Sequence, residues 1–157
     1  MKNTQILIFT DLDGSLLNHN NFEFREIKNF ILNCIKNGIK IIPNTSKTKS
    51  EIEVFLDQLG QNLPFVVENG AAIHNLDLVH RKFKFKNNSL VFSRSVNEIL
   101  ELFEKRIPIE LKKRCSFLKD MSSIEQMKIL GLNKKYLPFA LNREYSMPLV
   151  FDGSKEL

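Results

Sequence analysis

The feature that most constrains this chain of 157 residues is an apolar run, Ile6 to Phe9, that ends in two carboxylates and a glycine. An uninterrupted apolar run bounded by a turn signal is typical of a strand buried on both faces. Such strands belong to parallel sheets packed between helices. The sequence therefore predicts an α/β fold in which Asp11 and Asp13 follow the carboxyl end of the first strand, the edge where open α/β sheets bind ligands.

The two carboxylates are two positions apart, so their side chains would face the same way in a continuing strand, and Gly14 allows a sharp turn beyond them. Crowded carboxylates repel each other unless a cation or a shared proton intervenes. Mg²⁺ is the natural cation, because it takes one or two carboxylates and substrate phosphate. Asp11 or Asp13 could then attack a phosphoryl group while its neighbour transfers protons. The alternative interpretation is an acidic turn after a core strand.

A helix and a second strand follow the acidic turn. Apolar residues recur at helical spacing over residues 22–37, and Gly38 stands where a helix would end. Residues 39–43 then read as a strand with its proline at the end. Together with the first strand, these segments predict one βαβ unit.

A polar cluster, Thr45-Ser46-Lys47, follows the second strand. Thr48 and Glu51 have the spacing of a capping box, which predicts a helix from there to Gly60. Hydroxyls and a lysine beside a helix N-terminus suit phosphate, because the free N–H groups and the helix dipole favour an anion. The alternative is that the cluster only caps the helix.

A third strand is predicted over residues 63–67 and is followed by Glu68-Asn69-Gly70. In a parallel sheet, the three strand ends would lie along one edge. Asn69 is therefore a candidate substrate contact, with turn and backbone hydrogen bonds as the alternative.

The charge of +5 is divided unevenly along the chain. Residues 1–80 hold 7 Lys and Arg against 9 Asp and Glu, giving −2, and residues 81–157 hold 16 against 9, giving +7. A basic second half facing an acidic first half would attract an anionic substrate, although a solvated lysine-rich surface would give the same composition. Because the basic residues are interleaved with acids and form no nucleic-acid motif, no nucleic-acid partner is expected.

No apolar run is long enough to cross a bilayer, and the N-terminus leads directly into a predicted core strand. We therefore expect no signal peptide, no membrane partner and a cytoplasmic location. The sequence predicts no particular oligomeric state.

The stretch Asp11-Leu12-Asp13-Gly14-Ser15-Leu16-Leu17 resembles the D-x-D-G-[TS]-L-L signature of the haloacid dehalogenase superfamily of phosphohydrolases. The resemblance implies that Asp11 is the nucleophile and a Mg²⁺ ligand. It also implies that Asp13 is the general acid/base, with its backbone carbonyl reaching the metal. Thr45 matches the Thr or Ser that hydrogen-bonds the transferring phosphoryl group in this superfamily.

Three further stretches, T-S-K-T, V-E-N-G-A-A-I, and Arg143-Glu144-Tyr145 followed by Pro148, resemble mannosyl-3-phosphoglycerate phosphatases. This resemblance implies a small anionic phosphorylated sugar acid as substrate, hydrolysed to mannosylglycerate and phosphate. It also implies that residues 1–80 form the N-terminal part of a Rossmann-like core and residues 81–157 an inserted α/β cap. Arg143 would be a cap residue for the anionic groups of the substrate, unless it pairs with Glu144 or caps a helix.

The chain departs from the superfamily pattern in one respect. A lysine after the cap and a G-D-x-x-N-D segment do not occur before Leu157, so we expect the C-terminal core strands to be missing and the sheet to keep an unpaired edge. Two hypotheses follow. One is a Mg²⁺-dependent phosphatase acting through an aspartyl-phosphate. The other is a catalytically incomplete fragment that binds a phosphorylated ligand or needs a partner chain.

Overall fold

The computed structural model describes residues 6–17, 24–79, 82 and 85–153. The chain divides into two compact units, Met1–Phe92 and Ser93–Leu157, and each is described by itself. The boundary between these compact units lies at 92/93, whereas the core and cap ranges expected from the sequence meet at 80/81. The reason is that the strand Ser89–Val91 pairs with the strand Ala72–His74 and so joins the first unit. The assignment of the two units to core and cap stays a prediction.

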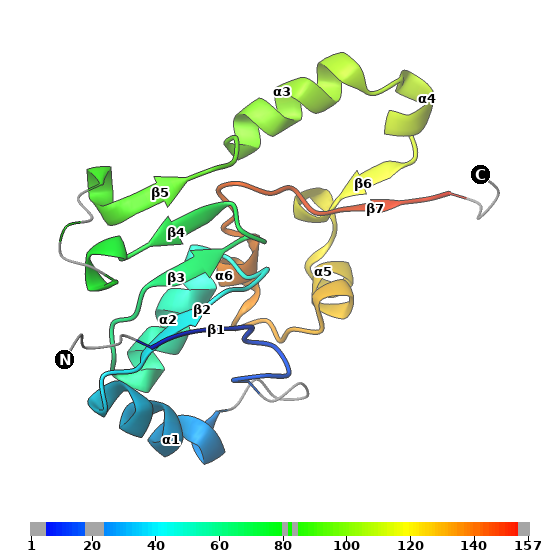
Figure 1. Ribbon diagram of the computed structural model, residues 1–157. Coiled ribbons are helices and arrows are strands. Elements are labelled where there is room, and N and C mark those ends of the chain that lie inside the picture. Colours follow the sequence, from blue (N-terminus) through cyan, green and yellow to red (C-terminus); the bar gives the residue numbers. More distant parts are fainter. Residues whose placement is uncertain (1–5, 18–23, 80–81, 83–84, 154–157) are drawn as a thin grey trace. The chain divides into compact units, whose positions relative to one another are not determined.

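The first unit contains strands and helices that alternate along its N-terminal part (Figure 1). Its elements are β1 (Leu7–Thr10), α1 (Arg25–Lys36), β2 (Lys40–Pro43), α2 (Lys49–Leu59), β3 (Phe65–Val67), β4 (Ala72–His74), the 3₁₀ helices η1 (Leu76–Leu78) and η2 (Lys86–Asn88), and β5 (Ser89–Val91).

The strands of this unit lie in chain order from β1 to β5 (Figure 1). β1 and β2 are parallel, with Leu7 opposite Lys40 and Thr10 opposite Pro43. A single parallel bridge from Asn44 to Val66 connects β2 to β3, and β3, β4 and β5 are antiparallel. The parallel β1–α1–β2 unit confirms the α/β class that the sequence predicted.

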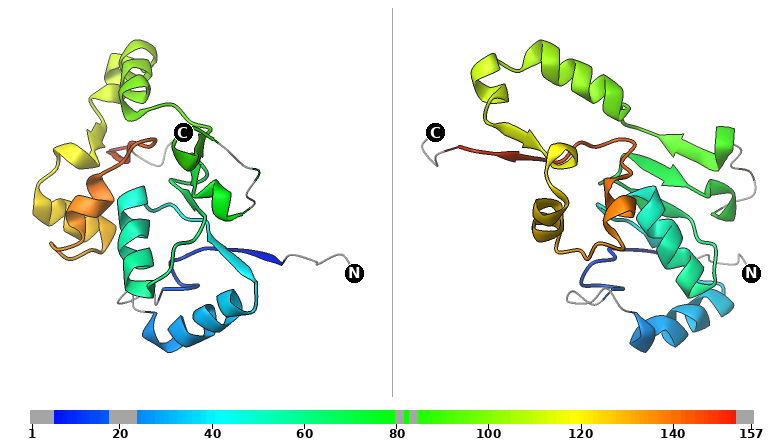
Figure 2. Two further views of the ribbon diagram at one scale, coloured as in Figure 1. Left: turned by 90° about the vertical axis from the view of Figure 1, so that its left-hand side faces the viewer. Right: turned by 180° about the vertical axis from the view of Figure 1, so that it is seen from behind.

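The core of this unit lies between the middle strands and α2. Buried side chains come from β2 and β3 and from the helix face that carries Ile52, Phe55 and Leu59. The right-hand view of Figure 2, which shows the chain from behind, shows α2 lying across the strands. The predicted capping box is present, and Gly60 ends the helix at φ 75°, a left-handed conformation that suits glycine. The prediction for α2 is therefore confirmed at both ends.

The prediction for β1 was wrong in one respect, because its side chains are not buried. Ile6, Leu7, Ile8 and Phe9 are 52%, 40%, 40% and 60% exposed. Among the described residues, β1 pairs only with β2, so its other edge carries no strand and its apolar side chains reach the solvent. A run of apolar residues predicts a strand well, whereas burial also depends on what covers that strand.

The second unit consists of short helices and one strand pair. Its elements are α3 (Val96–Arg106), α4 (Ile109–Lys112), β6 (Cys115–Phe117), the 3₁₀ helix η3 (Leu118–Asp120), α5 (Ser123–Leu130), α6 (Leu137–Leu141) and β7 (Leu149–Phe151). β6 and β7 are antiparallel. Ser95 with Glu98, and Ser122 with Glu125, have the spacing of a capping box in the sequence, and these boxes open α3 and α5. In the part of the chain that the structure describes, every helix is too short or too polar to span a bilayer.

Candidate active site

Asp11 directly follows β1 and is exposed at the carboxyl end of this strand. Its Oδ1 accepts a hydrogen bond of 2.7 Å from the Leu12 amide, which fixes the carboxylate at the start of a tight turn. The Leu12 carbonyl accepts from the amides of Ser15, Leu16 and Leu17, and Gly14 lies at φ 71°. A left-handed conformation at this position is easiest for glycine, so the local sequence specifies the turn that carries both aspartates.

The segment after β2 places a buried threonine at the same edge of the sheet. Thr45 is 4% exposed, and its amide donates to the Val66 carbonyl at 3.2 Å. Its Oγ1 accepts from the Lys47 amide at 3.2 Å. The side chain is therefore held between β2 and β3 rather than free in a loop.

The turn after β3 is hydrogen-bonded to this segment. The Glu68 amide donates to the Lys47 carbonyl and the Asn69 amide to the Thr45 carbonyl, both at 3.0 Å. Glu68 and Asn69 have φ values of 49° and 60°, which are unusual for residues other than glycine. Such backbone strain persists only where the surroundings fix it, and the two hydrogen bonds provide that fixation.

These segments surround a cavity of about 480 Å³. We call it the strand-end cavity; its lining residues are Asp11, Asn44, Thr45, Ser46, Asn69 and Gly70. Four of the side chains that the sequence singled out thus come together: the expected nucleophile, the two hydroxyls and the Asn69 amide. Asn44 and Gly70 were not predicted, although each stands at a strand end beside a predicted residue.

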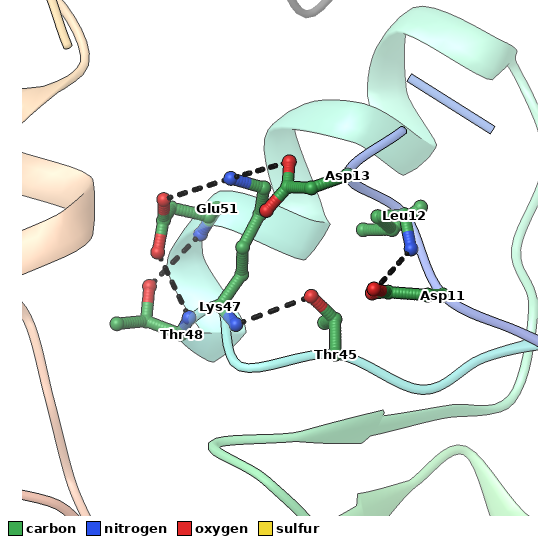
Figure 3. Close-up of polar contacts among 7 residues, drawn as sticks. All are labelled: Asp11, Leu12, Asp13, Thr45, Lys47, Thr48 and Glu51. Carbon is green, nitrogen blue, oxygen red and sulfur yellow. Dashed lines mark hydrogen bonds and ion pairs between the residues drawn. The ribbon is translucent and has the colours of Figure 1, made fainter. Parts of the chain in front are cut away.

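Asp13 is not among the residues that line the strand-end cavity. Its carboxylate forms an ion pair with Lys47 (Figure 3). Its Oδ1 lies 3.1 Å from Nζ of Lys47. The same ammonium lies 3.7 Å from Oε1 of Glu51 on α2. The sequence predicted Lys47 as a phosphate contact and did not single out Glu51 for the site. The spacing of four residues between Lys47 and Glu51 was the available signal, because such pairs meet on a helical turn.

Arg143 belongs to the second unit, and the structure does not relate its position to the strand-end cavity. Its Nη1 donates a hydrogen bond of 2.7 Å to Oγ of Ser146. The predicted contact between Arg143 and the anionic groups of a substrate stays a prediction.

The donor set at this edge fits Mg²⁺ only in part. The described residues contain no group of three or more His, Cys, Asp or Glu side chains that could hold a metal. Asp11 offers one exposed carboxylate, and the Asp13 carboxylate is paired with Lys47. Mg²⁺ takes one or two carboxylates and completes its octahedron with water and phosphate, so these residues form an incomplete site.

Comparison with known proteins assigns the class. The model of the haloacid dehalogenase-like hydrolase family matches residues 8–136, and the chain therefore belongs to this family. The matched range contains both aspartates, the cluster after β2 and the turn after β3.

Two curated relatives are similar over almost the whole chain. The chain is 31% identical over 158 residues to a glucosyl-3-phosphoglycerate/mannosyl-3-phosphoglycerate phosphatase of Persephonella marina, covering 97% of this chain and 57% of that protein. It is 29% identical over 155 residues to a mannosyl-3-phosphoglycerate phosphatase of Pyrococcus horikoshii, covering 96% of this chain and 61% of that protein. The chain thus spans little more than half the length of these relatives.

A solved haloacid dehalogenase-like hydrolase from Bacteroides thetaiotaomicron is 20% identical to the chain. The alignment covers 65% of this chain and 36% of that one, with a TM-score of 0.49.

Proposed function

We propose that this chain acts in the hydrolysis of a phosphomonoester, with Asp11 as the nucleophile. The observation that supports this most directly is the strand-end cavity, which an exposed Asp11 carboxylate shares with Thr45, Ser46 and Asn69. A carboxylate beside hydroxyl and amide donors can attack a phosphoryl group that those donors hold.

The proposed reaction has two displacement steps. A carboxylate oxygen of Asp11 attacks phosphorus, the bond from phosphorus to the ester oxygen breaks, and Asp13 gives its proton to the leaving oxygen. Asp13 then takes a proton from water, whose oxygen attacks the same phosphorus. The bond from phosphorus to the Asp11 oxygen breaks, so that inorganic phosphate and the free carboxylate are released.

The proposed substrate is a sugar linked to phosphoglycerate. The relatives from Persephonella and Pyrococcus are named as phosphatases of glucosyl- or mannosyl-3-phosphoglycerate. Thr45, Ser46 and Asn69 would bind the phosphate, and Arg143 would bind an anionic group of the same substrate. The expectations of a cytoplasmic location and of no nucleic-acid or membrane partner depend on the sequence alone.

Mg²⁺ enters this proposal as an expectation from the family. Asp11 and the backbone carbonyl of Asp13 are the expected protein ligands, and the ion would offset negative charge on the phosphoryl group. Because the described residues form an incomplete site, no step above depends on the metal.

The test is the release of inorganic phosphate from mannosyl-3-phosphoglycerate and glucosyl-3-phosphoglycerate, with and without Mg²⁺. We expect Asp11→Asn to lower turnover on the order of 10³-fold or more, because an amide cannot act as the nucleophile. Asp57→Asn is the matched control, since Asp57 is an exposed aspartate on α2 away from the strand-end cavity. Turnover retained in Asp11→Asn would overturn the assignment of the nucleophile.

The incomplete metal site favours a second candidate function, which is binding of a phosphorylated ligand without turnover. In that case inorganic phosphate would shift the amide resonances of Thr45, Ser46 and Asn69, while no phosphate would be released from the esters. Metal-dependent phosphate release by the chain would exclude this candidate.

A further inference from the structure

Lys47 lies between two carboxylates that come from different elements (Figure 3). Its Nζ lies 3.1 Å from Oδ1 of Asp13, on the turn after β1, and 3.7 Å from Oε1 of Glu51, in the first turn of α2. These pairs connect the expected acid/base to the N-terminus of a packed helix.

Glu51 is itself fixed in place. Its Oε2 accepts a hydrogen bond of 2.9 Å from the Thr48 amide, and its own amide donates to Oγ1 of Thr48 at 3.2 Å. Its two carboxylate oxygens therefore make different contacts. Oε2 completes the capping box, and Oε1 faces Lys47. A side chain held in this way gives Lys47 a defined position.

Burial distinguishes these pairs from an ordinary surface ion pair. The Lys47 and Glu51 side chains are 13% and 11% exposed. On the same helix, Lys49 and Glu53 form a pair of 3.8 Å with side chains that are 40% and 54% exposed. Exposed pairs contribute little, whereas pairs shielded from solvent and salt are screened less. The ion pairs of Lys47 are therefore the stronger positional constraint.

The carboxylate of Asp13 is anchored at one oxygen. Oδ1 is buried, and its contact with Nζ of Lys47 is an ion pair without hydrogen-bond geometry, while the Asp13 side chain as a whole is 32% exposed. Fixing Oδ1 also fixes the direction of the second oxygen, Oδ2. A proton donor and acceptor needs such a fixed direction, because its oxygen must reach the leaving group and then the attacking water.

We propose that Lys47 is a positioning residue that holds the Asp13 carboxylate in one orientation for proton transfer, instead of binding the substrate phosphate. This inference rests on the proposed function, in which Asp13 is the acid/base. The orientation of Asp13 can nevertheless be measured without turnover.

The direct test is the side-chain rotamer of Asp13 in the whole chain, from three-bond couplings of Cγ to the backbone nitrogen and carbonyl carbon. The chain as it stands should give the couplings of a single χ1 rotamer. Lys47→Met, which keeps the aliphatic stem, should give averaged couplings. Lys49→Met removes an exposed lysine of α2 that does not contact Asp13, and it should leave the Asp13 couplings unchanged. Couplings of Asp13 that stay the same in Lys47→Met would overturn the proposal.

A second variant covers the event that Lys47→Met does not fold. Glu51→Gln keeps an oxygen for the Thr48 amide and removes the charge that holds Lys47. Glu51→Gln should shift the Asp13 couplings toward averaged values, by a smaller amount than Lys47→Met does. Unchanged couplings in this variant would also count against the proposal.

Kinetics separate positioning from phosphate binding. A positioning role predicts that Lys47→Met lowers kcat by roughly 10-fold and changes KM by less than about twofold. A direct phosphate contact predicts mainly a higher KM. If the chain releases no phosphate at all, the proposed function fails, and the Asp13 couplings still decide the role of Lys47.

Discussion

Thr48 shows how one residue connects a helix cap to the ion pairs of Lys47. It is fully buried, its hydroxyl caps α2, and its amide holds Glu51, the carboxylate that fixes Lys47. The capping box could be predicted from the spacing of Thr48 and Glu51. The ion pair from Lys47 to Asp13 could not, because it joins residues 34 positions apart that only the fold brings together.

Removal of the Thr48 hydroxyl tests this arrangement. Thr48→Ala should lower the free energy of unfolding by about 1 kcal/mol, because the Glu51 amide loses its acceptor at the buried end of α2. Thr48→Ser keeps the hydroxyl and should lose less. Urea unfolding followed by circular dichroism measures both variants. An unchanged midpoint in Thr48→Ala would contradict this account of the cap.

At the scale of elements, the helices with capping boxes were the most predictable parts of the chain. α2, α3 and α5 begin where their boxes predict, since both the acceptor and the acid are written in the local sequence. β4, β5 and β6 were not predicted, because each has three residues and, unlike β3, none lies in a longer apolar run that marks it as a strand. Their place depends on pairing partners distant in sequence.

The capping boxes of the second unit predict a pH dependence. Hydrogen bonds from the Ser95 hydroxyl and amide hold the pKa of Glu98 below its ordinary value of 4.5. The pKa of Glu98 is lower in the folded chain than in the unfolded chain. These hydrogen bonds therefore stabilise α3 above pH 4.5, and that stabilisation is lost as the pH falls through the folded pKa. A titration of the Glu98 carboxyl followed by NMR should give a pKa below 4.5. Ser95→Ala should raise this pKa part of the way back, because alanine removes the hydroxyl donor and keeps the amide donor. A pKa unaffected by Ser95→Ala would contradict the stated cause.

β1 is the element whose environment the sequence predicted incorrectly, and it carries a prediction of its own. An edge strand with exposed apolar side chains is prone to pair with other chains. Phe9→Lys should therefore reduce concentration-dependent association measured by sedimentation velocity. Ile124→Lys is the control, because Ile124 is 76% exposed on a helix rather than on an open strand edge. Equal effects of the two variants would show that β1 has no special part in association.

At the scale of the whole molecule, the family match covers much more of the chain than the strand-end cavity does. The family model spans both units, from residue 8 to residue 136, while the described cavity is lined by residues of the first unit alone. The strand ends and their polar residues could be predicted, because apolar runs and turn signals mark them. A complete Mg²⁺ site could not be assembled from the described residues. The Asp11 carboxylate is exposed, the Asp13 carboxylate is paired with Lys47, and these two alone do not complete the coordination of Mg²⁺.

The most direct measurement is a search for the acyl phosphate on Asp11. The chain is mixed with mannosyl-3-phosphoglycerate and Mg²⁺, quenched in acid within the first turnover and reduced with borohydride, which converts an aspartyl-phosphate to homoserine. Peptide mass spectrometry then locates the modified residue. Our account predicts homoserine at position 11 and none in Asp11→Asn. Homoserine at another aspartate, or phosphate release with no modified aspartate, would contradict it.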